Sequence, residues 1–342
     1  MKLKTGRDEG EHQPPIWKRV WAGVSWLVRR AFWWSFAGWL VSLFASYHWA
    51  AELASHFRVQ YAFITMSGAA VYATRGRHLF TLATSVLALV IVYPILPYWI
   101  PVATDRSEKA AQEPTIRVAT FNLLAMSRDV EALRTFCAEE RPDVLILEEV
   151  TPWWAEQIDA LPGYADKRIA ERNGAFGIAV LTRLPIDRVQ LFSLGNAAYP
   201  AWNIVVNTPS GRVRVMGVHA TPPVGARRAA LRNQQLAKVA AMVRQDEPTV
   251  VLGDLNVTPW SPWFRDLLDD SGLRDARRGF GVLATWPAQI PPARMPIDHC
   301  LISRHFTVVD ARRGPFAESD HAPLVVDLRR STAPSASGRT DH

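Results

Sequence analysis

The feature that most constrains this chain is an uncharged apolar run near its beginning. Residues 31–51 read AFWWSFAGWLVSLFASYHWAA, which is 21 residues without a formal charge when His48 is neutral. A helix of this length can cross the hydrocarbon core of a bilayer. Two further apolar runs follow at 57–73 and 79–100. We therefore predict three transmembrane helices over 31–101, and two crossings are the alternative because the middle run is short.

The cations around these runs predict their orientation. Short basic loops remain in the cytoplasm, and the first connection holds only Arg58, opposed by Glu52. Residues 1–30 are expected to be a cytoplasmic basic N-terminus of a multi-pass inner (plasma) membrane protein, with everything after residue 101 on the extracytoplasmic, periplasmic side. The alternative, buried helices of a water-soluble protein, is disfavoured by the length of the runs. The cations that flank the first run and separate the second from the third are Lys18, Arg19, Arg29, Arg30, Arg75 and Arg77.

Composition limits what the chain can bind. The net charge is +7, yet residues 114–330 hold 26 Lys and Arg against 24 Asp and Glu, so the excess comes largely from the N-terminal region. Such a balance lacks the basic surface of a tight nucleic-acid binder. Cys137 and Cys300 make neither a zinc spacing nor a disulfide framework. Residues 102–113 are expected to be a linker and 331–342 a disordered tail.

Residues 114–330 alternate β-rich runs with helical patterns. Apolar residues recur at helical spacing in 129–140, 153–161 and 226–245. Many short strands with helices between them predict an α/β (α+β) domain in which two packed mixed sheets are flanked by helices. The expected strands lie near 116–123, 143–150, 176–182, 187–193, 201–207, 212–218, 249–255, 298–303, 308–313 and 322–328.

Polar side chains fall at the ends of several of these strands. Acids, amides and imidazoles are costly to bury unless they bind something, and groups of them mark candidate functional sites. The segments concerned are TFNLL, LILEEV, VRVMGVHATPP, VVLGDLNVTPW, MPIDHCLIS and ESDHAPL, which contain Asn122, Glu149, His219, Asp254, Asn256, Asp298, Asp320 and His321.

The ordered set LEEV, GDLN, IDH and SDH resembles the endonuclease/exonuclease/phosphatase superfamily over residues 116–328. The phrases GDLNVTPWSPWF, LATWP and MPIDHCLIS are most similar to its bacterial membrane-bound members with hydrophobic N-terminal segments. The resemblance implies a four-layer α/β sandwich with the active site at one end of the two sheets.

The resemblance also implies a metal site. Glu149 would hold a catalytic divalent cation, Mg²⁺ or alternatively Mn²⁺, with Asn122 and Asp320 nearby. Oxygen ligands suit a hard cation that keeps several of its waters.

The catalytic residues carried over by the resemblance are three acids or amides and two histidines. Asp254, helped by Asn256, would orient or deprotonate the attacking water. His321, polarised by Asp298, and His219 would stabilise the charge on the phosphoryl oxygens, and the sequence leaves open which of the two moves a proton.

Alternation along a strand separates neighbouring candidates. Only one of Glu148 and Glu149 can face the site, and we favour Glu149, which makes Glu148 a solvated or rim carboxylate. His299 follows Asp298 on a strand, so it is expected to face away and to be structural.

Three residues have two readings each. Asn173 either contacts the substrate or forms a turn before Gly174. Arg227, like Arg228 and Arg232 on the same helix, either meets an anionic substrate or belongs to a solvated face. Trp286 forms a rim for a base or lipid, or packs.

The function that follows is a membrane-anchored, metal-dependent, nuclease-like phosphoesterase acting on phosphodiester bonds. The alternative is a lipid-headgroup or other small-molecule phosphodiesterase or phosphatase, since a membrane anchor concentrates such a substrate. The different-class rival is a non-catalytic membrane binding protein. Nucleic acid or phospholipid as substrate, and the lipid bilayer, are the expected partners.

Overall fold

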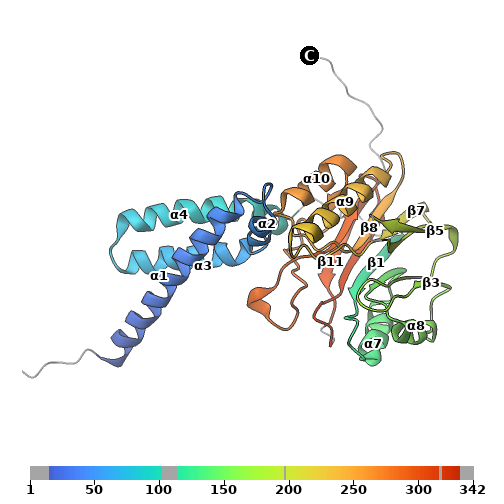
Figure 1. Ribbon diagram of the computed structural model, residues 1–342, viewed down its shortest axis with the longest axis horizontal. Helices are drawn as coiled ribbons and strands as arrows, with labels where there is room; N and C mark the ends of the chain where they lie inside the picture. The colour runs from blue at the N-terminus through green and yellow to red at the C-terminus, as the bar shows by residue number, and fades with distance from the viewer. Residues whose placement is uncertain (1–14, 102–113, 196–197, 316–317, 332–342) are drawn as a thin grey trace, which may run out of the picture.

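The computed structural model describes residues 15–101, 114–195, 198–315 and 318–331, which form a helical region followed by a two-sheet sandwich (Figure 1). The first 14 residues of the expected basic N-terminus, the expected linker at 102–113 and the expected tail from residue 332 lie outside the described residues.

The helical region differs from the expected helix boundaries at its start. The run at 31–51 is not one helix, because the first helix begins at Ile16 and ends at Ser42. A second helix starts after His48, whose extended backbone and ring acceptor for the Ala50 N–H cap it. An absence of charge therefore did not mark the helix ends. The helices are α1 (Ile16–Ser42), α2 (Trp49–Ser55), α3 (Arg58–Thr74) and α4 (His78–Val92), continued by η1 (Tyr93–Ile95) and α5 (Leu96–Trp99).

One helix among the described residues is both long and apolar enough to cross a bilayer. It runs through His78–Trp99, has 22 residues and a mean hydropathy of 2.3. The 27-residue α1 carries cations in its first half, and α3 has 17 residues. The three crossings therefore stay a prediction.

The sandwich confirms the expectation of two packed mixed sheets. One sheet has the order β11-β12-β1-β2-β4-β3 and the other β5-β6-β7-β8-β10-β9. The pairs β1–β2 and β7–β8 are parallel and the others antiparallel. The strands are β1 (Thr115–Asn122), β2 (Val144–Glu148), β3 (Asp166–Ala170), β4 (Ile178–Thr182), β5 (Ile186–Leu194), β6 (Tyr199–Thr208), β7 (Gly211–Gly217), β8 (Thr249–Asp254), β9 (Arg274–Asp275), β10 (Asp298–Ile302), β11 (Phe306–Arg313) and β12 (Leu324–Arg330).

Alternation along each strand builds the layers. On β1, Val118 joins the core between the two sheets, whereas Ala119 and Phe121 face the helices outside. Helices α7 and α8 cover one sheet, and α9 and α10 pack on the other. The helices are α7 (Val130–Glu140), α8 (Pro152–Asp159), α9 (Ala226–Met242) and α10 (Pro262–Ser271), with a short η2 (Pro291–Ala293). Of these elements, α10 and the strands β3 and β9 were not expected.

The helical region packs directly on the sandwich. Ile91 and Tyr98 share a core with Trp260 and Val282. The Tyr98 hydroxyl donates to Asp275 at 3.0 Å, and its carbonyl accepts from the Gly281 N–H at 2.6 Å. In Figure 1 the short α2 lies where the helices meet the sandwich.

Candidate active site

The polar residues at the strand ends lie together at one end of the sandwich. In the first sheet the register places Asn122 of β1 beside Glu148 of β2. In the second it places Asp254 of β8 opposite Asp298 of β10. Asn122 bridges the sheets, because its amide nitrogen donates to the Asp254 carboxylate at 3.3 Å. The two sheets thus bring residues more than a hundred positions apart into one cluster.

Glu149 turns into this cluster as β2 ends. Its φ is 59°, a left-handed conformation that ends the strand. One carboxylate oxygen accepts from the Asn122 amide at 3.2 Å and the other from the Ala125 N–H at 2.7 Å. The side chain is therefore held by two donors at the mouth of the site.

The loop after β8 fixes Asp254. Gly253 has a φ of 140°, and a Cβ there would lie 1.8 Å from the Val218 carbonyl oxygen, so only glycine allows β8 this close to the neighbouring strand. Asn256 is left-handed, its N–H donates to Asp254 at 2.9 Å and its amide donates to the Ala220 carbonyl at 3.0 Å. The GDLN motif thus holds the carboxylate through its own backbone.

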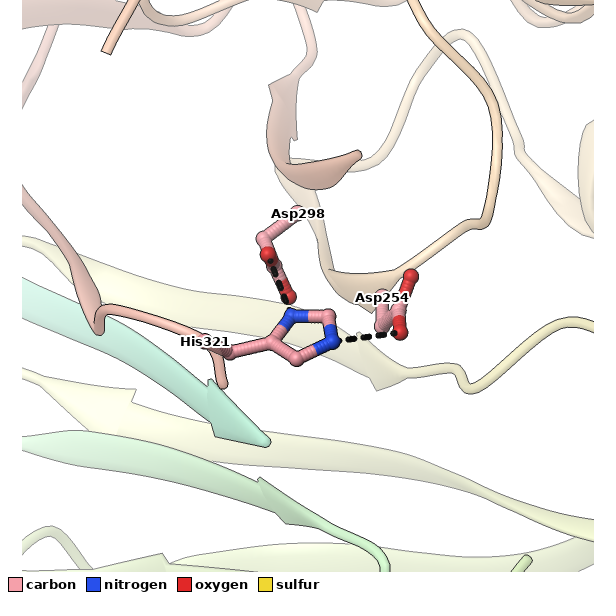
Figure 2. A group of neighbouring side chains, drawn as sticks. All are labelled: Asp254, Asp298 and His321. Atoms are coloured by element: carbon pink, nitrogen blue, oxygen red, sulfur yellow. Dashed lines mark hydrogen bonds and ion pairs between the residues drawn. The ribbon is translucent and has the colours of Figure 1, made fainter. Parts of the chain in front are cut away.

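Asp254, Asp298 and His321 form a relay, shown in Figure 2. The His321 Nδ1 lies 2.9 Å from Asp298, and its Nε2 lies 3.7 Å from Asp254. Thr285 donates to the same Asp298 oxygen at 2.5 Å. Burial by itself lowers the pKa of His321, but Asp298 outweighs it, aided by Asp254 and Asp320, and raises that pKa to about 10. His321 is therefore an imidazolium.

The environment of the site shifts the pKa values of Asp254 and His219 in opposite directions. Burial, together with the charge of Asp298, raises the pKa of Asp254, whereas the charge of His321 and the hydrogen bonds from Asn256 and Asn122 oppose this rise. His219 lies 3.7 Å from Asp254, and burial, with the charge of His321, lowers its pKa to about 4. One imidazole is thus charged and the other neutral, an arrangement that assigns different chemistry to each.

Glu149 and Asp320 are the carboxylates that would hold a hard cation at the mouth of the site. Both carboxylates line the same cleft, as does Asp254, and oxygen ligands suit Mg²⁺ or Mn²⁺. The group Asp254, Asp298 and His321 also has metal-like spacing, but the 2.9 Å contact between His321 and Asp298 engages two of its ligand atoms with one another. Asn122 turns its amide nitrogen to the carboxylates, so it would give an oxygen to a cation only with its amide turned over.

Asp320 is held by Trp286, which the sequence suggested was a rim or packing residue. The Trp286 indole donates to Asp320 at 2.8 Å, and both residues line the cleft. Trp286 is thus a positioning donor as well as a wall. Sequence reasoning missed the hydroxyls of Thr285 and Ser319. The Ser319 hydroxyl donates to the Asn122 carbonyl at 2.6 Å. Their signal in the sequence is that both lie inside quoted motifs, Thr285 in LATWP and Ser319 in SDH.

The prediction that Glu148 is a solvated or rim carboxylate is wrong. Glu148 is fully buried, accepts a hydrogen bond from Thr120 and has one carboxylate oxygen without a hydrogen-bond partner among the described residues. Burial, with the charges of Asp298 and Asp254, raises its pKa well above the usual value. Alternation failed because the strand ends between the two glutamates, and Glu148 still points into the space between the sheets, beneath the site.

His299 is structural, as expected. Its Nδ1 accepts from Arg277 at 2.8 Å and its Nε2 donates to the Val257 carbonyl at 2.7 Å, all in the interior. These bonds fix the ring away from the relay.

Two substrate-binding candidates lie outside the cleft. Asn173 and Arg227 are exposed and are not among its lining residues. Arg232, which was expected to meet substrate or solvent, does neither. It is fully buried, pairs with Glu52 of α2 at 2.6 Å and donates to the Asn256 carbonyl at 2.7 Å.

The cleft over these residues has a volume of about 440 Å³. Sequence reasoning placed its walls in the sandwich alone. The structure adds Leu53, His56 and Phe57 from the helical region, along with Phe176, Pro222, Pro223, Val224, Met295 and Ile297 from the sandwich.

The comparisons with known proteins agree with this geometry. Residues 119–321 match the model of the Endonuclease/Exonuclease/phosphatase family. The chain belongs to this family. Its members are hydrolases that act on phosphoester bonds. No curated protein sequence gives a significant match.

Solved structures share the fold at low identity. An endonuclease/exonuclease/phosphatase from Beutenbergia cavernae DSM 12333 aligns with a TM-score of 0.53 and 22% identity, covering 65% of this chain and 73% of that one. D. rerio TDP2 complexed with a single-strand DNA product gives 0.53 and 14%, covering 64% and 100%. The 3′ phosphatase NExo from Neisseria, bound to a product DNA hairpin, gives 0.52 and 22%, covering 62% and 98%. At these identities the similarity shows that this chain shares the fold of these proteins.

Proposed function

We propose that the chain is a membrane-anchored, divalent-metal-dependent phosphoesterase that hydrolyses phosphodiester bonds. The observation that carries this proposal is a single cleft in which Asp254 lies beside a charged and a neutral imidazole, with Glu149 and Asp320 in the same wall. Phosphoester hydrolysis needs an attacking water and a way to neutralise charge on the phosphoryl oxygens, and these groups supply both.

Each residue has a chemical role in this reaction. Asp254 orients the attacking water and takes its proton while the water oxygen bonds to phosphorus. The P–O bond to the leaving group then breaks, and the leaving oxygen takes up a proton from an imidazolium or from solvent. His321, fixed by Asp298, neutralises charge on a phosphoryl oxygen, and neutral His219 offers a hydrogen bond to the same group. Asn256 keeps the Asp254 loop in place.

The metal dependence rests on Glu149 and Asp320, with Asn122 beside them. A bound Mg²⁺ or Mn²⁺ would polarise the phosphoryl group and lower the pKa of a bound water. Trp286 and Asn122 orient the two carboxylates that would hold it.

A nucleic-acid phosphodiester is supported by the solved relatives described with single-strand DNA and with a DNA hairpin. Asn173 and Arg227 would then contact the chain of nucleotides beyond the cleft, because both are exposed outside it. The alternative, a lipid-headgroup phosphodiester, is supported by the apolar side chains of the cleft.

The membrane anchor is supported by the helical region. Large apolar side chains such as Trp34, Leu79 and Leu89 are 70% or more exposed there, and an apolar surface of this size is normally covered by lipid or protein. The cations between the apolar helices support an orientation in which the sandwich lies on the extracytoplasmic side of the inner membrane. Reporter fusions after residue 110 test this topology, and a cytoplasmic signal there would refute it.

The activity is tested on the full chain in lipid nanodiscs with bis-p-nitrophenyl phosphate. We expect release of p-nitrophenol that requires Mg²⁺ or Mn²⁺, is abolished by a chelator and is lost in Asp254→Asn. The matched control is Asp246→Asn, since Asp246 is an exposed carboxylate that pairs with Arg244 on the surface. Turnover that survives Asp254→Asn, or none in the wild-type protein, would rule the proposal out.

A further inference from the structure

The catalytic cleft has a wall that does not come from the catalytic domain. Leu53, His56 and Phe57 lie where α2 passes into α3, and all three line the cleft with Asp254 and His321. We refer to these three residues as the α2–α3 corner. A group bound in this cleft would contact both regions.

A buried ion pair connects the α2–α3 corner to the loop after β8 that carries Asn256. Glu52 is buried, and its carboxylate accepts from Arg232 at 2.6 Å and from Ser261 at 2.8 Å, with the His56 ring at 3.4 Å. Arg232 in turn donates to the carbonyl of Asn256, two residues after Asp254. The corner is therefore fixed in register with the reacting groups.

The chemistry of the cleft wall does not suit a polyanion. Among the residues that line it there is no Lys or Arg in the part of the chain that the structure describes. Nucleic-acid sites take most of their affinity from Lys and Arg contacts to successive phosphates. A single phosphoester, in contrast, would need only the imidazoles and one cation held by the carboxylates of the cleft.

Most of the side chains that line the cleft are apolar. Phe57 and Val224 are 39% and 61% exposed, so each presents apolar area that a bound group could cover. A pocket lined by apolar side chains with a few convergent polar groups at one end binds an amphiphile in a defined direction. The helical region that carries Phe57 is also the part whose outer surface is apolar.

We propose, resting on the hydrolase function proposed above, that the α2–α3 corner is part of the substrate site and that the substrate is a membrane amphiphile. Its phosphoester lies at Asp254 and His321, and its long apolar group packs on Phe57, Leu53 and Val224. The N-terminal helices then do more than hold the enzyme at the bilayer, because they form the surface that recognises the apolar half of the substrate.

The test compares two synthetic esters that share the scissile group, methyl 4-nitrophenyl phosphate and octyl 4-nitrophenyl phosphate, using the full chain in nanodiscs. Burial of the longer chain is expected to raise kcat/KM for the octyl ester about tenfold or more above the methyl ester. In Phe57→Ser this ratio should fall about fivefold. Serine is a favourable residue at the helix N-cap that Phe57 occupies, so the variant should fold.

Phe63→Ser is the matched control. Phe63 is 68% exposed on the same helix and does not line the cleft, so its loss should leave the octyl-to-methyl ratio unchanged. Equal rates for the two esters, an equal fall in both variants, or faster cleavage of a single-stranded DNA oligonucleotide than of the octyl ester would each overturn the inference while the hydrolase function stands. Absence of hydrolysis of every ester would overturn both.

Discussion

The helical region and the sandwich treat apolar surface in opposite ways. Among the described residues, 27 large apolar side chains are exposed between Ile16 and Ile100, and six are exposed in the sandwich. The sandwich buries its apolar residues between its own layers, whereas the helices turn theirs outward. The sandwich covers its apolar surface with its own layers. The exposed apolar surface of the helical region is of the kind that lipid or another protein normally covers.

The two regions meet through polar contacts as well as apolar ones. Glu52 and Arg232 are both buried at the junction, and a charge in such a place is tolerated only with its partner. The junction is therefore specific, which distinguishes this helical region from a flexible anchor. Each prediction below changes one region and measures the consequence.

The largest effect is expected within the sandwich. Asp254→Asn removes the group proposed to take the proton from water, and kcat should fall about a thousandfold or more, while the protein stays folded. The measurement is turnover of bis-p-nitrophenyl phosphate together with the circular dichroism spectrum. A loss below tenfold would show that Asp254 is not the base.

The next effect crosses the junction. Glu52→Ala leaves Arg232 buried without its partner, and removing one member of a buried ion pair costs about 3–5 kcal/mol. The free energy of unfolding of the sandwich, followed by its tryptophan fluorescence in denaturant, should fall by this amount.

Glu131→Ala is the control for that experiment, since the Glu131 side chain is 79% exposed and pairs with Arg134 on the surface. Its effect should stay within about 0.5 kcal/mol. Equal stability of the Glu52 and Glu131 variants would mean that the two regions are independent.

The same ion pair predicts a pH dependence of stability. Burial by itself raises the pKa of Glu52, but the hydrogen bond of His56 and the charge of Arg232 outweigh it and lower that pKa from 4.5 to about 2. The unfolded carboxyl therefore binds a proton first, so its contribution is complete above pH 4.5 and is lost as the pH falls towards 2. The contribution amounts to about 3 kcal/mol. In Glu52→Gln the slope of unfolding free energy against pH should be shallower over this interval, and an unchanged slope would contradict the assignment.

The sandwich residues that the structure brings together each lie in a local pattern of the sequence, which is why the sequence could single them out. Asp254 is the last residue of an apolar strand and Asn256 follows two residues later, and side chains at the ends of neighbouring strands lie close together. Glu148 was misplaced because alternation holds only inside a strand, and the chain leaves β2 through the left-handed Glu149. A backbone angle at one residue is not visible in the pattern.

The role of the helical region could not be predicted from local patterns. The Glu52–Arg232 pair joins residues 180 positions apart, and Arg232 lies on a helix whose spacing equally suits a solvated face. The end of α1 at Ser42 was missed because a run without charge can still contain a turn. Long-range pairing of charges and the placement of turns are decided by tertiary contacts.

A smaller effect is expected at the residues that support the proposed metal ligands. Trp286→Phe keeps the ring and removes the donor to Asp320, so the Mg²⁺ concentration for half-maximal activity should rise about tenfold. Trp263→Phe is the control, because Trp263 lies in α10, packs on the core and does not line the cleft. An equal Mg²⁺ requirement in the two variants would show that Trp286 does not orient a metal ligand.

The smallest effect is expected at the exposed start of α9. Arg227 lies outside the cleft, whereas Arg232, about one and a half turns further along the helix, is buried in the junction. Arg227→Ala should therefore change kcat/KM for the octyl ester less than about twofold, as surface substitutions away from a site do. Cleavage of single-stranded DNA should respond more, because a longer anion would pass over the exposed guanidinium. A large loss with the octyl ester would show that the sandwich face, and not the α2–α3 corner, carries the substrate beyond its phosphate.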